Sequence, residues 1–313
     1  MLIDSIPEQI ADLPLWERHQ VALSIIRLDQ THPHISGNKW FKLQPALRDA
    51  KRKPGRPLLS FGGPYSNHLH ALAYAGYQQG IPTLGVIRGE PVFPLNPTLQ
   101  DAERWGMRLH FVTREAYARR SDPEWIECLR AELGDFQMVP EGGSSPAAVQ
   151  ACADIWSYLS PQASLPDYLA CALGTGATAA GLITACPATT QVLVVPALKV
   201  SAETAGQMLS SHWTTSAYPS VSRYQVFSGD LPYARISPML AALWYQLSTC
   251  YGIDLDPVYT LRVYYRLSQL LLQGGFAPGS RVALLHTGGL QGLRGCRAQI
   301  EQRAPAFSGP LPL

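Results

Sequence analysis

The sequence predicts an α/β protein with parallel sheets, and three observations support this fold class. Short apolar runs alternate with helical patterns along most of the chain, which is typical of βα units. The runs Tyr168–Ala172 and Val192–Val195 are apolar enough to be strands buried on both faces, as strands of parallel sheets are. The length of 313 residues gives one large or two medium domains with an independent core.

The first half of the chain contains the clearest local signals. Leu58–Phe61 is a short apolar run that enters Gly62-Gly63-Pro64, and a helical pattern follows from Ser66 to Gly80. We therefore expect a strand, a turn and a capped helix there. The same rhythm returns in two more predicted strands, Thr83–Ile87 and Leu109–Val112, and two more predicted helices, Leu99–Trp105 and Glu124–Leu133.

The second half has longer helical patterns. Helices are predicted at Pro238–Cys250 and Tyr259–Leu272, and a last strand at Arg281–Leu285 ends in a Gly-rich turn. The sequence has no evident internal repeat. Ser160–Pro166 is the better candidate for a crossing between domains, and Lys51–Pro57 is the weaker one.

The chain is close to neutral, with 25 Lys and Arg residues, 23 Asp and Glu residues and a formal net charge of +2. This balance gives no electrostatic reason to expect a nucleic acid or an anionic membrane as a partner. We interpret the short basic run Lys51-Arg52-Lys53 as a solvated linker. A hydrophobic content of 46% excludes a disordered chain, and 26 Gly and 26 Pro residues indicate many tight turns.

Membrane, export and disulfide signals are missing. No uninterrupted apolar stretch approaches the roughly 18 residues of a membrane span, and the N-terminus carries acids where a signal peptide carries bases. We therefore expect a cytoplasmic protein. The cysteines are scattered without a Cys-x-x-Cys pair, so we expect reduced, mostly buried thiols rather than disulfides or a zinc site. They are Cys128, Cys152, Cys171, Cys186, Cys250 and Cys296.

The most informative segment is the Gly-rich turn Gly174-Thr175-Gly176-Ala177-Thr178, between a predicted strand and a predicted helix. Its N–H groups can converge and the helix adds its positive end, so the expected ligand is an anion, most often a phosphate. An ordinary βα turn is the alternative. Gly174-x-Gly176-x-x-Ala179 also matches the dinucleotide fingerprint, but the following strand region contains Lys199 and no acid, which disfavours a nicotinamide dehydrogenase.

Two other segments contain reactive side chains. Lys39 lies between a small polar turn and the aromatic pair Trp40-Phe41, an environment that could desolvate its amine and lower its pKa. A free amine can attack a carbonyl, whereas an ordinary surface charge is the alternative interpretation. Ser66 begins a helix, where it can serve as the N-cap while the helix end binds a carboxylate.

We expect two more Gly-rich turns, Glu141–Ser145 and His286–Gly289, to follow strands. In open parallel sheets such turns gather at one edge, where ligands bind. The histidine pairs His32-x-His34 and His68-x-His70 could suggest a metal site, but no clustered acids complete a ligand set. No metal is expected.

Six motifs occur together along the chain. They are Asn38-Lys39 with Lys42-Leu43, Gly62-Gly63 with Ser66-Asn67-His68, Pro140-Glu141-Gly142-Gly143-Ser144, Thr175-Gly176-Ala177-Thr178 with Gly181, Asp256-Pro257-Val258-Tyr259-Thr260 and His286-Thr287-Gly288-Gly289. With these motifs the chain resembles the 1-aminocyclopropane-1-carboxylate deaminase / D-cysteine desulfhydrase family of pyridoxal-phosphate enzymes. The resemblance runs from about Leu28 to Leu293.

The resemblance implies a tryptophan-synthase-β-like fold with pyridoxal 5'-phosphate in a cleft. Two three-layer α/β/α domains with mostly parallel sheets are expected. Residues 1–40 and 151–313 would form the large, cofactor-binding domain, and residues 41–150 the small one. The family resemblance also implies a small amino acid as substrate and a homodimer.

The resemblance assigns roles to single residues. Lys39 would form the Schiff base with the cofactor, and Lys42 would lie near the phosphate in the 174–178 turn. Catalysis is assigned to Lys39, Ser66 and Tyr259. The cofactor would be bound by Lys39, Lys42, Asn67 at the ring hydroxyl, Gly174, Thr175, Gly176, Ala177, Thr178, and Thr287 at the pyridine nitrogen. The substrate would be bound by Ser66, Asn67, His68 and Tyr259.

Departures from the family pattern bear on the activity. Ring-opening deaminases carry a second tyrosine two residues before the histidine of the last motif, where this chain has Leu284. This favours a D-cysteine desulfhydrase-like α,β-elimination that gives pyruvate, ammonia and sulfide. The alternatives are a 1-aminocyclopropane-1-carboxylate deaminase and a cofactor-binding relative with a different or lost activity. Thr260-Leu261-Arg262 replaces the usual Gly-Lys, which leaves the local helix start and a nearby positive charge open.

Overall fold

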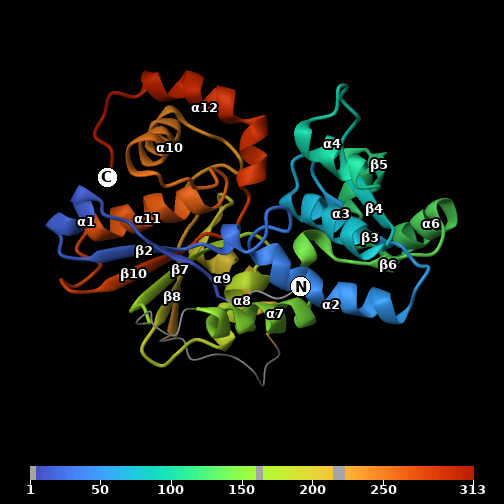
Figure 1. The fold of residues 1–313 in the computed structure, drawn as a ribbon, viewed down its shortest axis with the longest axis horizontal. Helices are drawn as coiled ribbons and strands as arrows, with labels where there is room; N and C mark the ends of the chain where they lie inside the picture. Colours follow the sequence, from blue (N-terminus) through green and yellow to red (C-terminus); the bar gives the residue numbers. More distant parts are fainter. Residues whose placement is uncertain (1–4, 160–164, 214–222) are drawn as a thin grey trace.

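The computed structural model describes residues 5–159, 165–213 and 223–313. It contains two lobes, each built on its own sheet (Figure 1). All neighbouring strands in these sheets are parallel except β1 and β2, which pair antiparallel. The predicted α/β class with mostly parallel sheets is therefore confirmed.

The larger sheet has six strands in the order β1-β2-β10-β7-β8-β9. Its strands are β1 (Glu8–Ile10), β2 (Ala22–Ile26), β7 (Tyr168–Leu173), β8 (Gln191–Pro196), β9 (Tyr224–Val226) and β10 (Arg281–Leu285). One face is covered by α10 (Pro238–Tyr251) and α11 (Thr260–Leu272), and the other by α7 (Pro146–Ala153) and α8 (Ala177–Thr184) (Figure 1). Helices α1 (Pro14–Arg18), α9 (Ala202–Ser210) and α12 (Arg297–Arg303) flank these layers.

The smaller sheet has four strands in the order β5-β4-β3-β6. They are β3 (Leu58–Gly62), β4 (Thr83–Arg88), β5 (Arg108–Val112) and β6 (Gln137–Met138). Helices α2 (Asn38–Arg52) and α3 (Asn67–Gln79) cover one face, with α4 (Pro97–Arg104) packed on α3. Helices α5 (Arg114–Ala118) and α6 (Pro123–Leu133) cover the other face.

Helix boundaries in the smaller lobe follow from local capping. The hydroxyl of Ser66 accepts a hydrogen bond from the Leu69 amide at 3.2 Å, which begins α3, and Gly80 ends it in the left-handed conformation. Asn96 caps α4 in the same way, through its side-chain oxygen. Every strand and helix that the local patterns predict is present, with shifts of a few residues at the ends.

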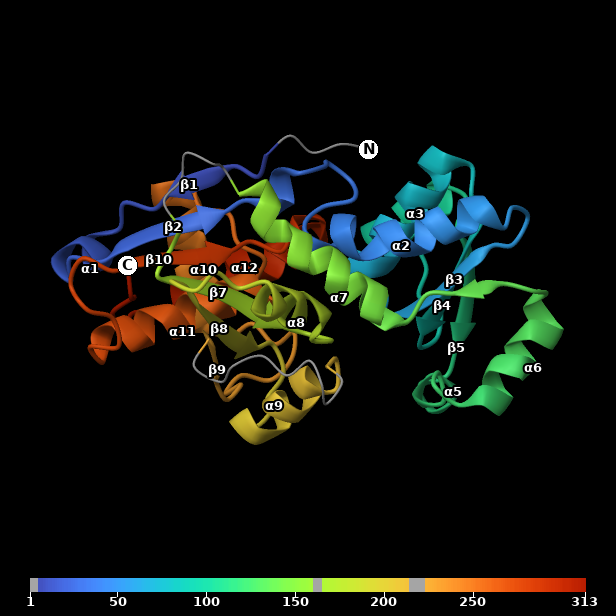
Figure 2. The ribbon, with the colours of Figure 1, turned by 90° about the horizontal axis from the view of Figure 1, so that it is seen from below.

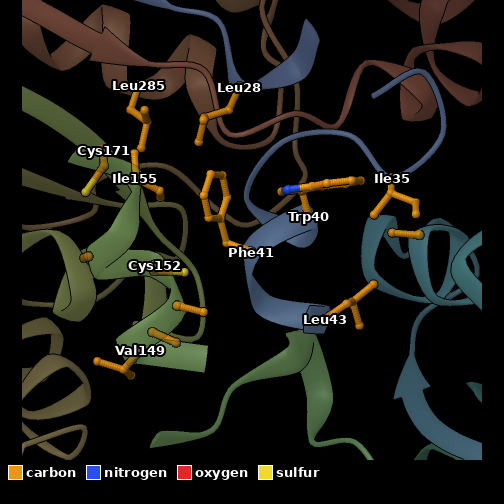
Figure 3. Packing of buried hydrophobic residues seen from close by; sticks show 14 of the residues in the cluster. Leu28, Ile35, Trp40, Phe41, Leu43, Val149, Cys152, Ile155, Cys171 and Leu285 are labelled. Carbon is orange, nitrogen blue, oxygen red and sulfur yellow. The ribbon is translucent and has the colours of Figure 1, made fainter. Parts of the chain in front are cut away.

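The largest buried cluster joins the two lobes. It contains residues of the smaller sheet, such as Leu58, and residues of the larger sheet, such as Leu169. Helices α2 and α7 lie between the sheets (Figure 2). Trp40 and Phe41 of α2 are buried in this cluster together with Cys152 of α7 (Figure 3). The lobes therefore share apolar surface, and burial of that surface stabilises their arrangement.

Several sequence expectations need correction. Lys51 and Arg52 form the exposed last turn of α2, so the basic run is a helix end rather than a linker. The thiols are free in the structure, but only three are buried, since two are exposed and Cys296 is intermediate. The segment Ser160–Pro166, proposed as a crossing between domains, falls largely outside the described residues. Strands β1 and β2 were not predicted.

The two-domain division remains a prediction. Residues 58–138 form the smaller sheet and residues 8–26 and 168–285 form the larger one. The expected boundary after residue 40 falls inside α2, so one helix would belong to both domains. Within the described ranges, no helix is both long and apolar enough to cross a membrane.

The start of α2 is fixed against the turn that follows β10. Gly37 has a φ of +73°, and a Cβ atom there would lie 2.0 Å from the Thr287 carbonyl oxygen. The Asn38 amide donates to that same oxygen at 3.2 Å. Only glycine fits this contact, because any side chain would push the two segments apart.

We predict that Gly37→Ala lowers the free energy of unfolding by about 2–4 kcal/mol, through backbone strain and the clash with Thr287. Urea unfolding of the cofactor-free protein measures this change. Gly55→Ala is the matched control, because Gly55 has a φ of +89° with no heavy atom within 4 Å of the added Cβ. It should cost about 1 kcal/mol, from conformation alone. Equal losses in the two variants would contradict the proposed clash.

Candidate active site

Two lysines lie one turn apart at the start of α2. Lys39 donates to the Asn38 side-chain oxygen at 2.8 Å, and Lys42 donates to the Thr175 hydroxyl at 3.2 Å. Burial and then the charge of Lys42 lower the pKa of Lys39 to about 7. Burial also lowers the pKa of Lys42. The site therefore holds an amine that is partly unprotonated near neutral pH.

The Gly-rich turn after β7 lies beside these lysines. Gly176, with a φ of +94°, is the N-cap of α8, so the first amides of this helix have no partner within the helix. Asn38 at the start of α2 donates to the Thr178 hydroxyl at 2.9 Å. The His212 ring contacts the Thr175 carbonyl at 2.7 Å. A helix N-terminus with an adjacent ammonium group is suited to a phosphate.

Two buried polar atoms near the lysines have no hydrogen-bond partner. They are Nδ1 of His68 and Oγ of Ser144. A Cβ at Gly143 would lie 3.2 Å from the His68 ring and 3.3 Å from the Cβ atom of Lys42, so His68 and Lys42 both lie against Gly143, the residue before Ser144. Burial and the two lysine charges lower the pKa of His68 well below its usual value, so its ring is neutral. Unpaired buried polar groups are costly unless a ligand completes them.

Asn67 and Asp256 both lie against Gly289, in the turn after β10. A Cβ at Gly289 would lie 2.9 Å from Nδ2 of Asn67 and 2.8 Å from Oδ2 of Asp256. Burial raises the pKa of Asp256 to about 7, although its bonds from backbone amides and the charge of Lys39 oppose this shift. Asp256 accepts hydrogen bonds from the amides of Val258 and Tyr259 at 3.2 and 2.6 Å. It therefore fixes the backbone that begins α11.

Tyr259 is paired with a second phenol. Its hydroxyl lies 2.9 Å from the hydroxyl of Tyr233, and its ring lies against Gly174 of the Gly-rich turn. Burial, followed by the proximity of Tyr233, raises the pKa of Tyr259. Ala234, next to Tyr233, has a φ of +54°, which is strained for a residue other than glycine.

The Thr260-Leu261-Arg262 departure left open where the local helix starts and whether a positive charge lies nearby, and the structure shows both. Helix α11 begins at Thr260, and Arg262 supplies a positive charge within its first turn. Its guanidinium donates to the loop carbonyls of Leu231, Pro232 and Arg235 at 3.0, 2.8 and 2.9 Å. It thereby anchors the loop that carries Tyr233.

The structure brings most of the expected residues around one space. Lys39, Lys42, His68 and the 174–178 turn are neighbours, and Asn67 and Tyr259 join them through Asp256 and Gly174. The Ser66 hydroxyl is used as the N-cap of α3. The Thr287 backbone holds the start of α2, and Thr287 is half-buried. In the described part of the chain, no cluster of His, Cys, Asp or Glu could hold a metal.

Three residues at this site were missing from the expected set. Asp256 belongs to a motif that supported the family resemblance, so a sequence signal for it existed. Tyr233 lies 26 residues from Tyr259 in the sequence, and its contact with Tyr259 places it at the site. Gln291 follows the His-Thr-Gly-Gly motif by two residues and bonds Asn67, and no sequence pattern indicated this.

The comparisons agree with this geometry. A family model described as "Pyridoxal-phosphate dependent enzyme" matches residues 9–288. A protein of Pyrococcus abyssi, provisionally named 1-aminocyclopropane-1-carboxylate deaminase, is 26% identical over 285 residues, covering 87% of this chain and 86% of that protein. A protein of Thermotoga maritima with the same provisional name is 25% identical over 297 residues, covering 89% and 92%.

Solved structures share the fold. The crystal structure of an ACC deaminase homologue has a TM-score of 0.81 at 22% identity, covering 97% of this chain and 95% of that one. Threonine deaminase isoform 2 from Solanum lycopersicum has a TM-score of 0.68 at 12% identity, covering 96% and 84%. These likenesses confirm the predicted tryptophan-synthase-β-like fold.

We predict that Lys42→Met raises the pKa of Lys39 in the cofactor-free protein, because the repelling charge is removed. The chain has five lysines, so reductive ¹³C-methylation and an NMR titration can resolve each amine. The Lys39 midpoint should move upward from about 7. Lys51→Met, which removes an exposed charge at the end of α2, is the control. An unchanged Lys39 midpoint in Lys42→Met would contradict the coupling.

Proposed function

The chain belongs to the pyridoxal-phosphate-dependent enzyme family, and we propose that it catalyses α,β-elimination from a small D-cysteine-like amino acid. The products would be pyruvate, ammonia and sulfide. The observation that favours elimination is Leu284, which is 0% exposed in β10. This position is where ring-opening deaminases carry a tyrosine, so the chain lacks that phenol.

The site residues fit the cofactor. We infer that Lys39 holds it covalently, while Lys42 and the 174–178 amides bind its phosphate. Asn67 would donate to the ring hydroxyl, and Thr287 would face the pyridine nitrogen. The orphaned polar atoms of His68 and Ser144 support this fit, because they need ligand partners. When bound, pyridoxal phosphate supplies the electron sink for the electrons left at Cα after its proton is removed.

The side chains then handle protons. An amine with a pKa near 7 is suited to take the Cα proton at neutral pH, which is the role proposed for Lys39. The Ser66 hydroxyl accepts from the Leu69 amide, so its own proton remains free to be donated to the substrate. Tyr259, kept protonated by its raised pKa, can donate to the departing sulfur. The overall reaction consumes one water and releases pyruvate, ammonia and hydrogen sulfide.

A second candidate is 1-aminocyclopropane-1-carboxylate deamination, which is favoured by the names of the relatives from Pyrococcus and Thermotoga. The Tyr233–Tyr259 pair favours this second candidate, because Tyr233 supplies a second phenol from another part of the chain. A cofactor-binding relative with a different or lost activity is the third candidate. Substrate screening separates the three, since the two reactions give different keto acids.

We predict that the purified holoenzyme releases pyruvate and sulfide from D-cysteine. The screen includes L-cysteine, other β-substituted amino acids and the cyclopropane amino acid, with pyruvate and 2-oxobutyrate measured separately. Release of 2-oxobutyrate from the cyclopropane amino acid alone would support the deaminase instead. If the holoenzyme binds the cofactor but turns over none of the substrates in the screen, the third candidate is supported.

We predict that Lys39→Ala abolishes both the visible absorption of the bound cofactor and turnover, with a rate loss of about 10²–10⁴-fold or more. Lys51→Ala should match the unmodified protein, since Lys51 is exposed and remote in the last turn of α2. Absorption spectra and initial rates are measured on the same preparations. Full activity in Lys39→Ala would overturn the assignment.

We also propose that the enzyme is a cytoplasmic homodimer, as the family resemblance implies. Light scattering during size-exclusion chromatography should give about twice the chain mass of 34.2 kDa. A monomeric mass would contradict the dimer without affecting the assignment of the reaction.

A further inference from the structure

A chain of hydrogen bonds connects the two lobes beside the active site. Gln291 lies in the turn Leu290–Gly295, which follows β10 of the larger sheet. Its Nε2 donates to Oδ1 of Asn67 at 2.6 Å, and its Oε1 accepts from the Thr98 hydroxyl at 2.9 Å. Asn67 begins α3 and Thr98 lies in the first turn of α4, both in the smaller lobe. One glutamine amide therefore joins the lobes through both of its polar atoms.

Arg294 determines which way this amide points. Its guanidinium donates to Oε1 of Gln291 at 3.3 Å and to Oδ2 of Asp101 at 2.6 Å. A guanidinium has donors only, so the glutamine end that faces it must be the oxygen. The NH₂ group of Gln291 then faces Asn67, and it can only donate. The same rule fixes Asn67, which must turn its oxygen toward Gln291 and its NH₂ group away.

Asp101 holds Arg294, at the end of this series of hydrogen bonds, in place. It is buried, and it also contacts the His70 ring at 3.3 Å. The bonds to Arg294 and His70 hold the pKa of the Asp101 carboxyl below its usual value, against the effect of burial. Asp101 is therefore a charged acceptor that keeps Arg294 oriented.

At the near end, the NH₂ group of Asn67 faces the space beside Gly289. A Cβ at Gly289 would lie 2.9 Å from Nδ2 of Asn67, so glycine leaves this position open. Among the residues that the structure describes, Nδ2 of Asn67 has no hydrogen-bond acceptor. An oxygen atom of a ligand would complete it.

We propose that Gln291 is a positioning residue that fixes the Asn67 amide with its NH₂ group toward the cofactor. This inference rests on the proposed role of Asn67 at the ring hydroxyl. The guanidinium of Arg294 only donates, so it sets the donor–acceptor direction of every hydrogen bond from Arg294 through Gln291 to Asn67. The cofactor oxygen therefore faces a donor rather than a second acceptor. Because Gln291 comes from the larger lobe, the orientation of Asn67 depends on contact between the lobes.

Gln291→Glu tests the polarity, because it keeps the shape of the side chain and removes its donors. The carboxylate can still accept from Arg294 and Thr98, but it repels the Asn67 oxygen, so the Asn67 amide turns over. Titration of the cofactor-free protein with pyridoxal phosphate should show a Kd that is about tenfold or more higher. Gln273→Glu, an exposed position after α11, introduces the same charge and should leave the Kd unchanged.

A double-mutant cycle separates amide orientation from the effect of the new charge. In an Asn67→Ala background, Gln291→Glu should change the Kd by less than about twofold, because no amide remains to be turned. Gln291→Met, which has neither donor nor charge, should raise the Kd by a smaller factor than Gln291→Glu and serves if the latter folds poorly. Circular dichroism of the cofactor-free variants checks folding.

The pH dependence gives a signature that a merely structural role would not produce. A protonated glutamic acid regains an O–H donor, so the ratio of the Gln291→Glu Kd to the unmodified Kd should fall as the pH is lowered. A Kd increase that persists in the Asn67→Ala background, or no increase at all, would overturn the inference. If Asn67→Ala leaves the Kd unchanged, both the role of Asn67 and this inference fail, whereas the Lys39 and product tests of the proposed reaction still stand.

Discussion

The contact between Gly37 and the Thr287 carbonyl is the constraint on which the site depends. It joins the start of α2 to the turn after β10, and thereby the beginning of the smaller lobe to the last strand of the larger sheet. Lys39 and Lys42 occupy the helical turn that follows, so their positions are set by this junction rather than by their own contacts. Trp40 and Phe41 on the same turn are buried in the cluster between the lobes, which fixes the rotation of the helix. Backbone fit and apolar burial together place the Lys42 amine at the Gly-rich turn and the Lys39 amine one turn before it along α2.

Placing two ammonium groups so close together costs stability, and the protein offsets this cost only in part. Lys39 has one side-chain acceptor, Asn38, and Lys42 has the Thr175 hydroxyl, so neither ammonium has a carboxylate within ion-pair distance among the described residues. Burial, and then the charge of Lys42, lowers the pKa of Lys39. The fold therefore destabilises the charged form of Lys39, and this makes its amine available as a base. A bound phosphate would stabilise the charged form of Lys42.

Local patterns were enough for the strands and helices, because apolar periodicity, caps and Gly-rich turns act over a few residues. The β3–Ser66–α3 unit is the clearest case, since its strand, turn and N-cap are all legible in Leu58–Gly80. Strands β1 and β2 escaped prediction because β1 is short and pairs with β2 on the edge of a sheet whose other strands lie more than 100 residues away. The motifs predicted which segments lie together at the site, but they did not predict the individual side-chain contacts between them. Gln291 reaches Asn67 across 224 residues, and Tyr233 meets Tyr259 only because Arg262 anchors its loop. Such contacts follow from tertiary packing and leave no periodic trace in the sequence.

The setting of Arg262 has a further consequence for how the enzyme would recognise its substrate. Four of the carbonyl contacts around its guanidinium come from the backbone of residues 197–235, and its remaining nitrogen, Nε, is buried without a partner. An arginine near an amino-acid site would ordinarily be expected to pair with the α-carboxylate, but this one has no free edge to offer. Under the proposed function, we infer that the amides at the start of α3 would bind that carboxylate instead. Selection among amino acids would then rest on the shape and direction of hydrogen bonds more than on charge, and such contacts can discriminate between the two mirror images of the proposed substrate.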